Sequence, residues 1–291
     1  MATERSPATD FASATGQIAT GVAWLDHHFE ACQDEYVAIL HAVGLEVGWH
    51  VLDAGCGSGS YLPWLADLLG TAGHLAALDL AADNVVTVEA RLAARPLPCP
   101  VAPQQGSVLA LPYPARQFDA VWCANTVQYL ADEEVAQALS EFRRVVRPGG
   151  LVALMGFDAT LARLEPGDPA LRWRLVEAVG RSEHRGRALL LANLRRWEQR
   201  LWLQRAGLEG VWQRSFPIEM WAPLTPAQRT YLLSLFHYYA AQAEDVGVPA
   251  DDLPTWRALA DASAPRHPLD QADFHWCETH VLTVGRVPAT G

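Results

Sequence analysis

Continuous apolar runs alternate with segments of helical periodicity along this 291-residue chain. The runs lie at residues 49–52, 74–80, 118–124 and 151–156. Segments with apolar positions three and four residues apart lie at 22–43, 82–94, 132–146, 169–179, 187–206 and 225–244. Strands that are apolar throughout are typical of parallel sheets covered on both faces, and the helical segments would supply that cover. The alternation therefore predicts an α/β fold with a mostly parallel sheet.

The first apolar run leads into a glycine-rich turn. Asp53 ends the run, and Gly55, Gly57 and Gly59 follow at alternate positions, which lets the backbone approach a ligand closely. The dinucleotide pattern G-x-G-x-x-G would need its third glycine at position 60, where this chain has Ser60. An acidic group at the strand end suits an ammonium or sulfonium ligand and would repel a pyrophosphate.

A second acidic residue ends the next apolar run. Asp79 follows Gly59 by 20 residues, a spacing that places its carboxylate to accept hydrogen bonds from a ribose diol. A glycine pattern alone is weak support for a cofactor site. Here it lies between two strands, each of which ends in an acid.

With these motifs the chain resembles the class I S-adenosylmethionine-dependent methyltransferases, and within them the small-molecule, ubiquinone-type branch called methyltransferase type 11. The matching segments are residues 51–59, 78–80, 106–114 with 118–121, and 142–152. The resemblance covers roughly residues 35–157. It implies S-adenosylmethionine as the cofactor and S-adenosylhomocysteine as its product. It also implies a doubly wound, Rossmann-like sheet of seven strands in the order 3-2-1-4-5-7-6, with the last strand antiparallel.

The resemblance also implies a set of cofactor-binding residues. These are Tyr36, Asp53, Gly55, Cys56, Gly57, Gly59, Asp79, Leu80, Ser107, Val108 and Asn125. Ser107 stands where the type 11 pattern usually has an aspartate that contacts the adenine amino group, so a hydroxyl and the neighbouring backbone would replace it. For Asn125 the alternative is that it caps the helix that follows.

Five segments are expected along the chain. They are a mobile tail at 1–20, an N-terminal helical cover at 21–45, the cofactor-binding core at 46–221, a helical lid at 222–273, and the last strand with a tail at 274–291. The lid would be inserted between strands six and seven, which a bare core joins by a tight hairpin. Such an excursion is either a lid or a dimerisation arm, so a homodimer is possible.

Three residues are candidates for a base that takes a proton from a hydroxyl or enol acceptor: His28, Tyr129 and His237. The motif Asp26-His27-His28 also raises the possibility of a metal site. Neighbouring helix residues point about 100° apart, and no second cluster with ligand spacing supports the motif. We therefore predict no metal.

Composition excludes several classes of function. The chain has no lysine, which rules out Schiff-base chemistry, and its net charge of −11 with no long basic run disfavours nucleic-acid partners. It has no apolar run of 18 residues and no signal-peptide pattern, so we expect no membrane association. Its five cysteines show neither C-x-x-C nor zinc spacing, as in a reduced cytoplasmic protein.

The predicted substrate is a small, apolar or aromatic secondary metabolite that is methylated on oxygen or carbon. N-methylation of a small amine is an alternative, since aromatic faces and carboxylates suit a cation. A protein that binds the cofactor without transferring its methyl group, as a cyclase or a non-catalytic partner, would carry the same motifs. An NAD(P) oxidoreductase is disfavoured because the third glycine comes too early and lysine is absent.

Overall fold

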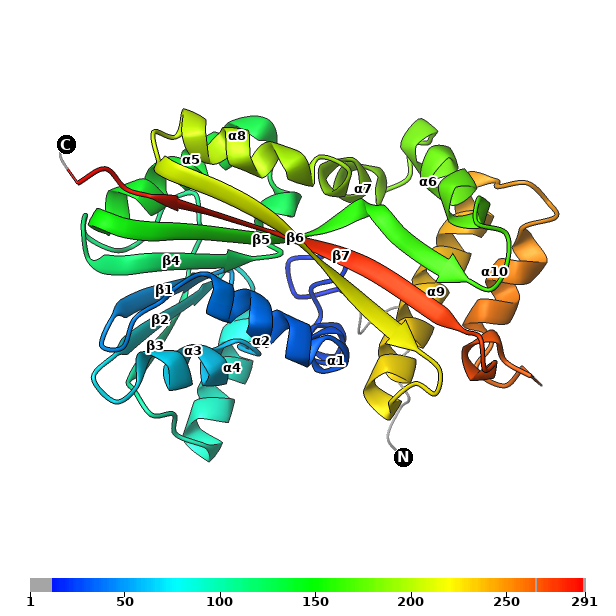
Figure 1. Cartoon of the computed structure of the whole chain (residues 1–291), viewed down its shortest axis with the longest axis horizontal. Coiled ribbons are helices and arrows are strands. Elements are labelled where there is room, and N and C mark those ends of the chain that lie inside the picture. Colours follow the sequence, from blue (N-terminus) through cyan, green and yellow to red (C-terminus); the bar gives the residue numbers. More distant parts are fainter. Residues whose placement is uncertain (1–11, 265, 290–291) are drawn as a thin grey trace.

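A sheet of seven strands organises the chain in the computed structural model, which describes residues 12–264 and 266–289 (Figure 1). The strands are β1 (His50–Ala54), β2 (His74–Asp79), β3 (Val101–Gln105), β4 (Phe118–Ala124), β5 (Val146–Glu165), β6 (Glu209–Trp221) and β7 (His275–Arg286). Their order is β3-β2-β1-β4-β5-β7-β6. The first five pair in parallel, whereas β7 runs antiparallel to both β5 and β6. The predicted Rossmann-like order is confirmed.

Helices cover both faces of the sheet (Figure 1). They are α1 (Val22–Ala31), α2 (Gln33–Ala42), α3 (Leu62–Leu69), α4 (Ala82–Ala94), α5 (Asp132–Val145), α6 (Leu171–Arg181), α7 (Arg187–Asn193), α8 (Gln199–Arg205), α9 (Pro226–Val246) and α10 (Leu253–Ala260). Val51 of β1 belongs to a hydrophobic cluster with α2 and α3, and the next residue, Leu52, to a second cluster with α5 and α8. Because successive strand residues point to opposite faces, β1 needs apolar residues at both positions. Among the described helices, none is both long and apolar enough to cross a membrane.

The third strand lies in a proline-rich segment, a composition that indicates a loop. β3 occupies Val101–Gln105 and contains Pro103, which has no amide hydrogen to donate to a neighbouring strand. This strand lies at the edge of the sheet, where it pairs only with β2. An edge strand can lack this donor without interrupting the hydrogen bonds between two strands. The prolines that indicated a loop are therefore compatible with an edge strand.

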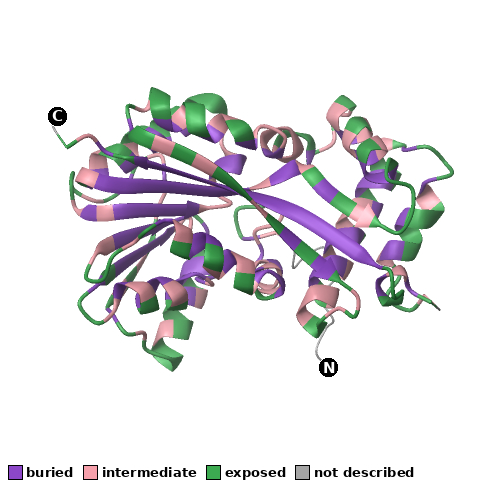
Figure 2. Cartoon of the chain, in the orientation of Figure 1, coloured by how far each residue is buried: buried purple, intermediate pink, exposed green. Residues whose placement is uncertain are grey.

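The fifth strand is much longer than the predicted 151–156. After Asp158 the pairing with β7 shifts in register and then resumes, with Arg163 opposite Cys277. The second half of β5, together with β6 and β7, extends beyond strands β1 to β4 toward α6, α9 and α10 (Figure 1). β7 is buried along nearly its whole length (Figure 2). This extension carries the inserted helices.

The insertion between β6 and β7 begins with α9, whose ends follow from local sequence. Thr225 caps the helix by accepting a hydrogen bond from the Gln228 amide at 3.2 Å, and the Gln228 side chain accepts one from the Thr225 amide at 3.0 Å. Pro226 occupies the first turn, and Gly247 ends the helix with a φ of +69°. α9 packs against α1 and α6, so the insertion reaches the carboxyl ends of the core strands.

Candidate active site

The turn after β1 places three glycines in conformations that other residues rarely adopt. Gly55, Gly57 and Gly59 have φ angles of +82°, +54° and +81°. The Gly55 amide donates to the carbonyl oxygen of Leu78 at 2.7 Å, and the Gly57 amide donates to Asp79 Oδ2 at 2.8 Å. The turn is thereby fixed to the end of β2. Its first two glycines line a cavity near the carboxyl ends of the parallel strands, the usual ligand position in such sheets.

Asp79 is held in one orientation at the end of β2. Its Oδ1 accepts hydrogen bonds from the Ala81 amide at 2.9 Å and from Asn84 Nδ2 at 3.1 Å, whereas Oδ2 accepts from the Gly57 amide. Since a carboxylate oxygen can accept two hydrogen bonds, Oδ2 can still accept one from a ribose hydroxyl. Asp79 and Leu80 both line the cavity, and the 55% exposed Leu80 offers an apolar surface beside the carboxylate.

Asp53 lies behind the cavity rather than in its wall. Its side chain is 1% exposed, and Oδ2 has no hydrogen-bond partner among the described residues. Burial, with a further contribution from Asp79, raises the pKa of Asp53 to about 8. The carboxyl is therefore protonated at neutral pH, and the free protein lacks the negative charge that the sequence places at this strand end.

Replacing Asp53 by asparagine should change how stability depends on pH. The pKa of this carboxyl is about 8 in the folded protein, above its ordinary value of 3.8, so its protonation stabilises the fold fully below about pH 4. That stabilisation is lost as the pH rises toward 8. We expect the urea unfolding midpoint of Asp53→Asn, measured relative to that of the parent, to rise between pH 4 and pH 8. If the two urea midpoints differed by the same amount at pH 4 and at pH 8, the pKa of Asp53 would not be raised in the folded protein.

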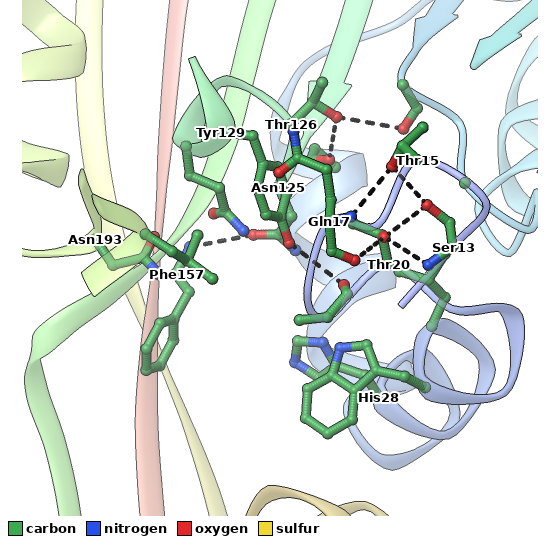
Figure 3. Close-up of a pocket in the computed structure, with 18 of the residues that line it drawn as sticks. Ser13, Thr15, Gln17, Thr20, His28, Asn125, Thr126, Tyr129, Phe157 and Asn193 are labelled. Atoms are coloured by element: carbon green, nitrogen blue, oxygen red, sulfur yellow. Dashed lines mark hydrogen bonds between the residues drawn. The ribbon is translucent and has the colours of Figure 1, made fainter. Parts of the chain in front are cut away.

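The loops after β3 and β4 complete this part of the cavity. Ser107 and Val108 line it, and the Ser107 hydroxyl accepts a hydrogen bond from the Leu109 amide at 3.2 Å. Asn125 also lines it, in a left-handed conformation with a φ of +50°. Its Oδ1 accepts from the Phe157 amide of β5 at 3.2 Å, so the side chain binds β5 rather than capping the next helix (Figure 3). These loops therefore meet the glycine turn at one cavity.

Residues 12–20, the described part of the expected tail, cross one side of the cavity (Figure 3). The Thr20 hydroxyl donates to the Gln17 carbonyl oxygen at 2.7 Å, and its oxygen lies 2.8 Å from Ser13 Oγ. The other expected tail residues, 1–11, lie outside the described residues. Sequence reasoning missed this contribution because a Ser/Thr-rich start has the composition of a solvated tail.

Tyr129 connects this segment to the core. Its hydroxyl donates to the carbonyl oxygen of Ile18 at 3.1 Å, and the carbonyl oxygen of Ala19 lies 3.3 Å away. Burial raises the pKa of Tyr129 to about 12. A phenol that already donates its hydrogen bond to the backbone, and whose ionisation is disfavoured, is poorly suited to act as a general base. Tyr129 lines the cavity, as predicted, but its geometry fits the role of holding residues 12–20.

A cavity of about 390 Å³ joins these groups to the inserted helices. Its wall on α6, α7 and α9 carries aliphatic side chains beside polar and aromatic ones, and we call these aliphatic side chains the apolar wall. They are Leu175, Val176, Val179, Leu189, Leu190 and Leu235. The cavity thus combines polar groups at the strand ends with the apolar wall on α6, α7 and α9, as small-molecule sites do.

His28 of α1 faces the same cavity and is held by a buried polar cluster. Its Nε2 lies 2.8 Å from the Tyr36 hydroxyl and 3.4 Å from Glu278 Oε1. His280 Nε2 lies 3.1 Å from the same oxygen, and Tyr231 donates to Glu278 Oε2 at 2.6 Å. These five residues, from α1, α2, α9 and β7, are called the histidine–glutamate cluster below.

Glu278 is ionised although it is fully buried. Burial favours its protonated form, but hydrogen bonds from His28 and His280 outweigh burial and lower the pKa of Glu278 well below its usual range. Because a carboxylate only accepts, we assign the His28 proton to Nε2, the atom that makes all of its hydrogen bonds to described residues. Nδ1 is then unprotonated. The His28 side chain is 15% exposed, so a molecule in the cavity can reach it.

Comparison with known proteins assigns this architecture to a family. Residues 51–150 match the family model of a methyltransferase domain. The chain carries a class I methyltransferase domain. Two solved structures share its fold. The YcgJ protein of Bacillus subtilis has a TM-score of 0.53 at 16% identity, over 88% of this chain and 99% of that one. The Haemonchus contortus phosphoethanolamine N-methyltransferase 2 has a TM-score of 0.55 at 14% identity, over 98% and 61%.

Curated relatives match the methyltransferase domain over part of their length. A 2-phytyl-1,4-naphtoquinone methyltransferase of Synechocystis is 29% identical over 140 residues, which are 47% of this chain and 56% of that protein. A malonyl-[acyl-carrier protein] O-methyltransferase of Pseudescherichia vulneris is 32% identical over 153 residues, which are 53% and 55%. The chain thus spans about half the length of these curated relatives.

Some residues predicted to bind the cofactor lie near the methyltransferase cavity without lining it. A Cβ on Gly59 would lie 2.9 Å from both Leu62 Cδ1 and Val88 Cγ2, so this glycine permits close packing of α3 and α4. Cys56 is buried in the turn, and Tyr36 is buried in the histidine–glutamate cluster. In this structure these three residues lie behind the cavity wall.

His237 lies on the exposed face of α9, outside the cavity of the methyltransferase domain. Its Nδ1 is 2.7 Å from the Leu233 carbonyl oxygen, whereas Tyr231, Leu235 and Tyr238 of the same helix line the cavity. Residues two positions away from Leu235 on a helix point to another face. The structure therefore does not bring His237 to the site, contrary to the sequence prediction.

The side chains of Asp26 and His28 have different partners, so the motif Asp26-His27-His28 does not form a single metal-binding site. Asp26 pairs with Arg91 at 2.5 Å, away from the His28 ring contacts. A different set, His28, Glu278 and His280, has ligand atoms within 4.8 Å of one another. A metal on His280 Nε2 would place a proton on Nδ1, which is buried and has no partner among residues 12–264 and 266–289. The hydrogen-bonded cluster therefore fits better. The absence of a metal stays a prediction.

Proposed function

We propose that this protein transfers the methyl group of S-adenosylmethionine to a small, largely apolar or aromatic acceptor, on oxygen or an activated carbon. The observation that carries the proposal is the shared cavity. The glycine turn and Asp79 line one part of it, and the apolar wall lines another. A cofactor and an acceptor can therefore occupy one cavity, as direct group transfer requires.

The first part of the cavity fits S-adenosylmethionine. A Cβ on Gly57 would be strained at its φ of +54° and would lie 2.8 Å from Leu25 Cδ1, so glycine suits this position. Asp79 Oδ2 can accept from a ribose hydroxyl, and the buried Asn84 Oδ1, which also lines the cavity, has no partner among the described residues. Leu80 supplies an apolar surface for the adenine ring of the cofactor. The bound cofactor would supply a methyl group already activated by its sulfonium charge.

His28 is the proposed base for a hydroxyl acceptor. Its Nδ1 would take the hydroxyl proton, and the resulting imidazolium would be stabilised through Nε2 by the ionised Glu278. A phenol or enol needs such a base near neutral pH, whereas an amine that is already neutral does not. The histidine–glutamate cluster therefore supports an oxygen or enol-carbon acceptor.

The cavity wall also favours an apolar acceptor over an amine. The carboxylates that line the described cavity are Asp79, beside the glycine turn, and Glu134. Glu134 caps α5, because its Oε2 accepts from the Ala131 amide at 2.8 Å. Neither belongs to the apolar wall. The relative named for a naphthoquinone acceptor agrees with a small acceptor of the natural-product or quinone kind.

Isotope-labelled methyl donor tests this proposal against its alternatives. Phenols, enols and amines would each be incubated with deuterated S-adenosylmethionine and the full chain, and the products analysed by mass. We expect label in phenols or enols. Label in amines alone would replace the oxygen or carbon assignment by N-methylation. Cofactor that binds but stays intact with every acceptor would favour a cyclase or a non-catalytic partner.

Asp79→Ala should weaken S-adenosylhomocysteine binding by about 1–3 kcal/mol, or roughly 5- to 150-fold, the usual cost of a lost buried hydrogen bond. The variant also removes the acceptor that holds the Gly57 amide. Calorimetry measures the affinity. Asp67→Asn, at an exposed position of α3, is the matched control and should bind as the parent does. Equal affinity in Asp79→Ala would remove Asp79 from the cofactor site.

A further inference from the structure

Arg172 of α6 is a buried cation that lines the cavity without an ionic partner. The residue is 6% exposed, its Nη1 donates to the Ala159 carbonyl oxygen at 2.8 Å, and its buried Nε has no partner in the described part of the chain. The Tyr239 hydroxyl is its other polar neighbour. Arg174, two residues further, is more exposed and pairs with both Asp168 and Asp252. No carboxylate of the described residues forms such a pair with Arg172.

An unpaired guanidinium is costly inside a protein. It carries five N–H donors and a full charge, and arginine is rarely buried unless it is paired. Folding alone gives no reason to place this group beside the apolar wall with no carboxylate among the described side chains to pair it. A ligand that carries a negative charge would supply the missing partner.

We propose that Arg172 binds a carboxylate on the methyl acceptor. The inference rests on the proposed function, since it assigns a further group to the same substrate. A guanidinium matches a carboxylate through two parallel hydrogen bonds. Arg172 is the one arginine among the described residues that line the cavity, so a single negative charge suits it better than a doubly charged phosphate.

The same helix face provides room for the rest of such a molecule. Leu175, Val176 and Val179 follow Arg172 by three, four and seven residues, which is the spacing of one helix face. All four line the cavity. An acid bound at Arg172 can therefore lay an apolar body along α6. The expected acceptor class is an aromatic or aliphatic carboxylic acid that also carries the hydroxyl or enol to be methylated.

Pairs of acids and their primary amides test the charge with almost unchanged shape. The probes are 4-hydroxyphenylacetate, 4-hydroxybenzoate and 4-hydroxycinnamate, each with its amide, and binding is measured by calorimetry with S-adenosylhomocysteine present. The parent should bind at least one acid about tenfold or more tightly than its amide, as expected for a charge-assisted pair. Arg172→Gln should lose this preference. Arg181→Gln, exposed on the same helix, should keep it.

The stability of the free protein separates ligand binding from a structural role. Arg172→Met removes an unpaired buried charge, so its unfolding temperature should equal or exceed that of the parent. A clear decrease would overturn the inference, as would equal binding of acids and amides, or no binding of any acid while S-adenosylhomocysteine still binds. If S-adenosylhomocysteine itself failed to bind the parent, the proposed function would fail instead.

Discussion

Methyl transfer to a hydroxyl acceptor should fall by roughly 10²- to 10⁴-fold in His28→Ala, the range that a positioned general base contributes. His28 lines the cavity, and its Nε2 is held by Tyr36 and Glu278, so the ring is fixed with Nδ1 available. The ring also stacks on Tyr231, with centroids 4.7 Å apart. The affinity for S-adenosylhomocysteine should not change. Single-turnover transfer from labelled cofactor measures the rate, and calorimetry measures the affinity.

Two further variants make this result specific. His27→Ala removes the neighbouring imidazole, which does not line the cavity, and should leave the rate unchanged. Glu278→Gln keeps the size of the side chain but removes the charge that stabilises the imidazolium. Its rate should fall, because the imidazolium formed on His28 would lose the ionised partner at Nε2. A parent-like rate in His28→Ala would mean that the proton leaves by another route.

Gly55→Ala should lower the free energy of unfolding by about 2–5 kcal/mol, combining the cost of a left-handed Cβ with that of overpacking. The added Cβ would overlap Thr126, lying 2.6 Å from its Cγ2 and 2.9 Å from its Cβ. Thr126 cannot move freely, because its hydroxyl donates to the Ala124 carbonyl oxygen at 3.0 Å. The turn would shift and binding of S-adenosylhomocysteine should be lost. Urea unfolding and calorimetry measure the two effects.

Gly44→Ala is the matched control for this variant. Gly44 has a φ of +81°, nearly that of Gly55, but a Cβ there would have no neighbour within 4 Å. Its substitution should therefore cost only about 1–2 kcal/mol, the conformational part, and leave the affinity for S-adenosylhomocysteine unchanged. Equal losses in the two variants would show that Thr126 does not restrict the turn.

The parallel core could be predicted because its signals are local. The helix expected at 82–94 is found at Ala82–Ala94, and the strand expected at 118–124 at Phe118–Ala124. Each is an apolar pattern bounded by turn residues. The second half of β5 could not be predicted, because it is polar in part and becomes a strand only by pairing with β7, more than 100 residues later.

The candidate site divides in the same way. Gly55, Gly57 and Asp79 could be predicted because they form a local motif, and the structure places all three at the cavity. Glu278 could not, since it lies 250 residues from His28 in sequence and reads as one polar residue in a buried strand. His237 was misplaced because composition shows that a helix carries a histidine but not which face meets the core.

The central claim is that the glycine turn and Asp79 hold S-adenosylmethionine. Calorimetric titration of the full chain with S-adenosylmethionine, and separately with NAD⁺, tests it most directly. We expect saturable binding of one S-adenosylmethionine per chain and no binding of NAD⁺. Binding of NAD⁺, or no binding of S-adenosylmethionine by the folded protein, would contradict the account.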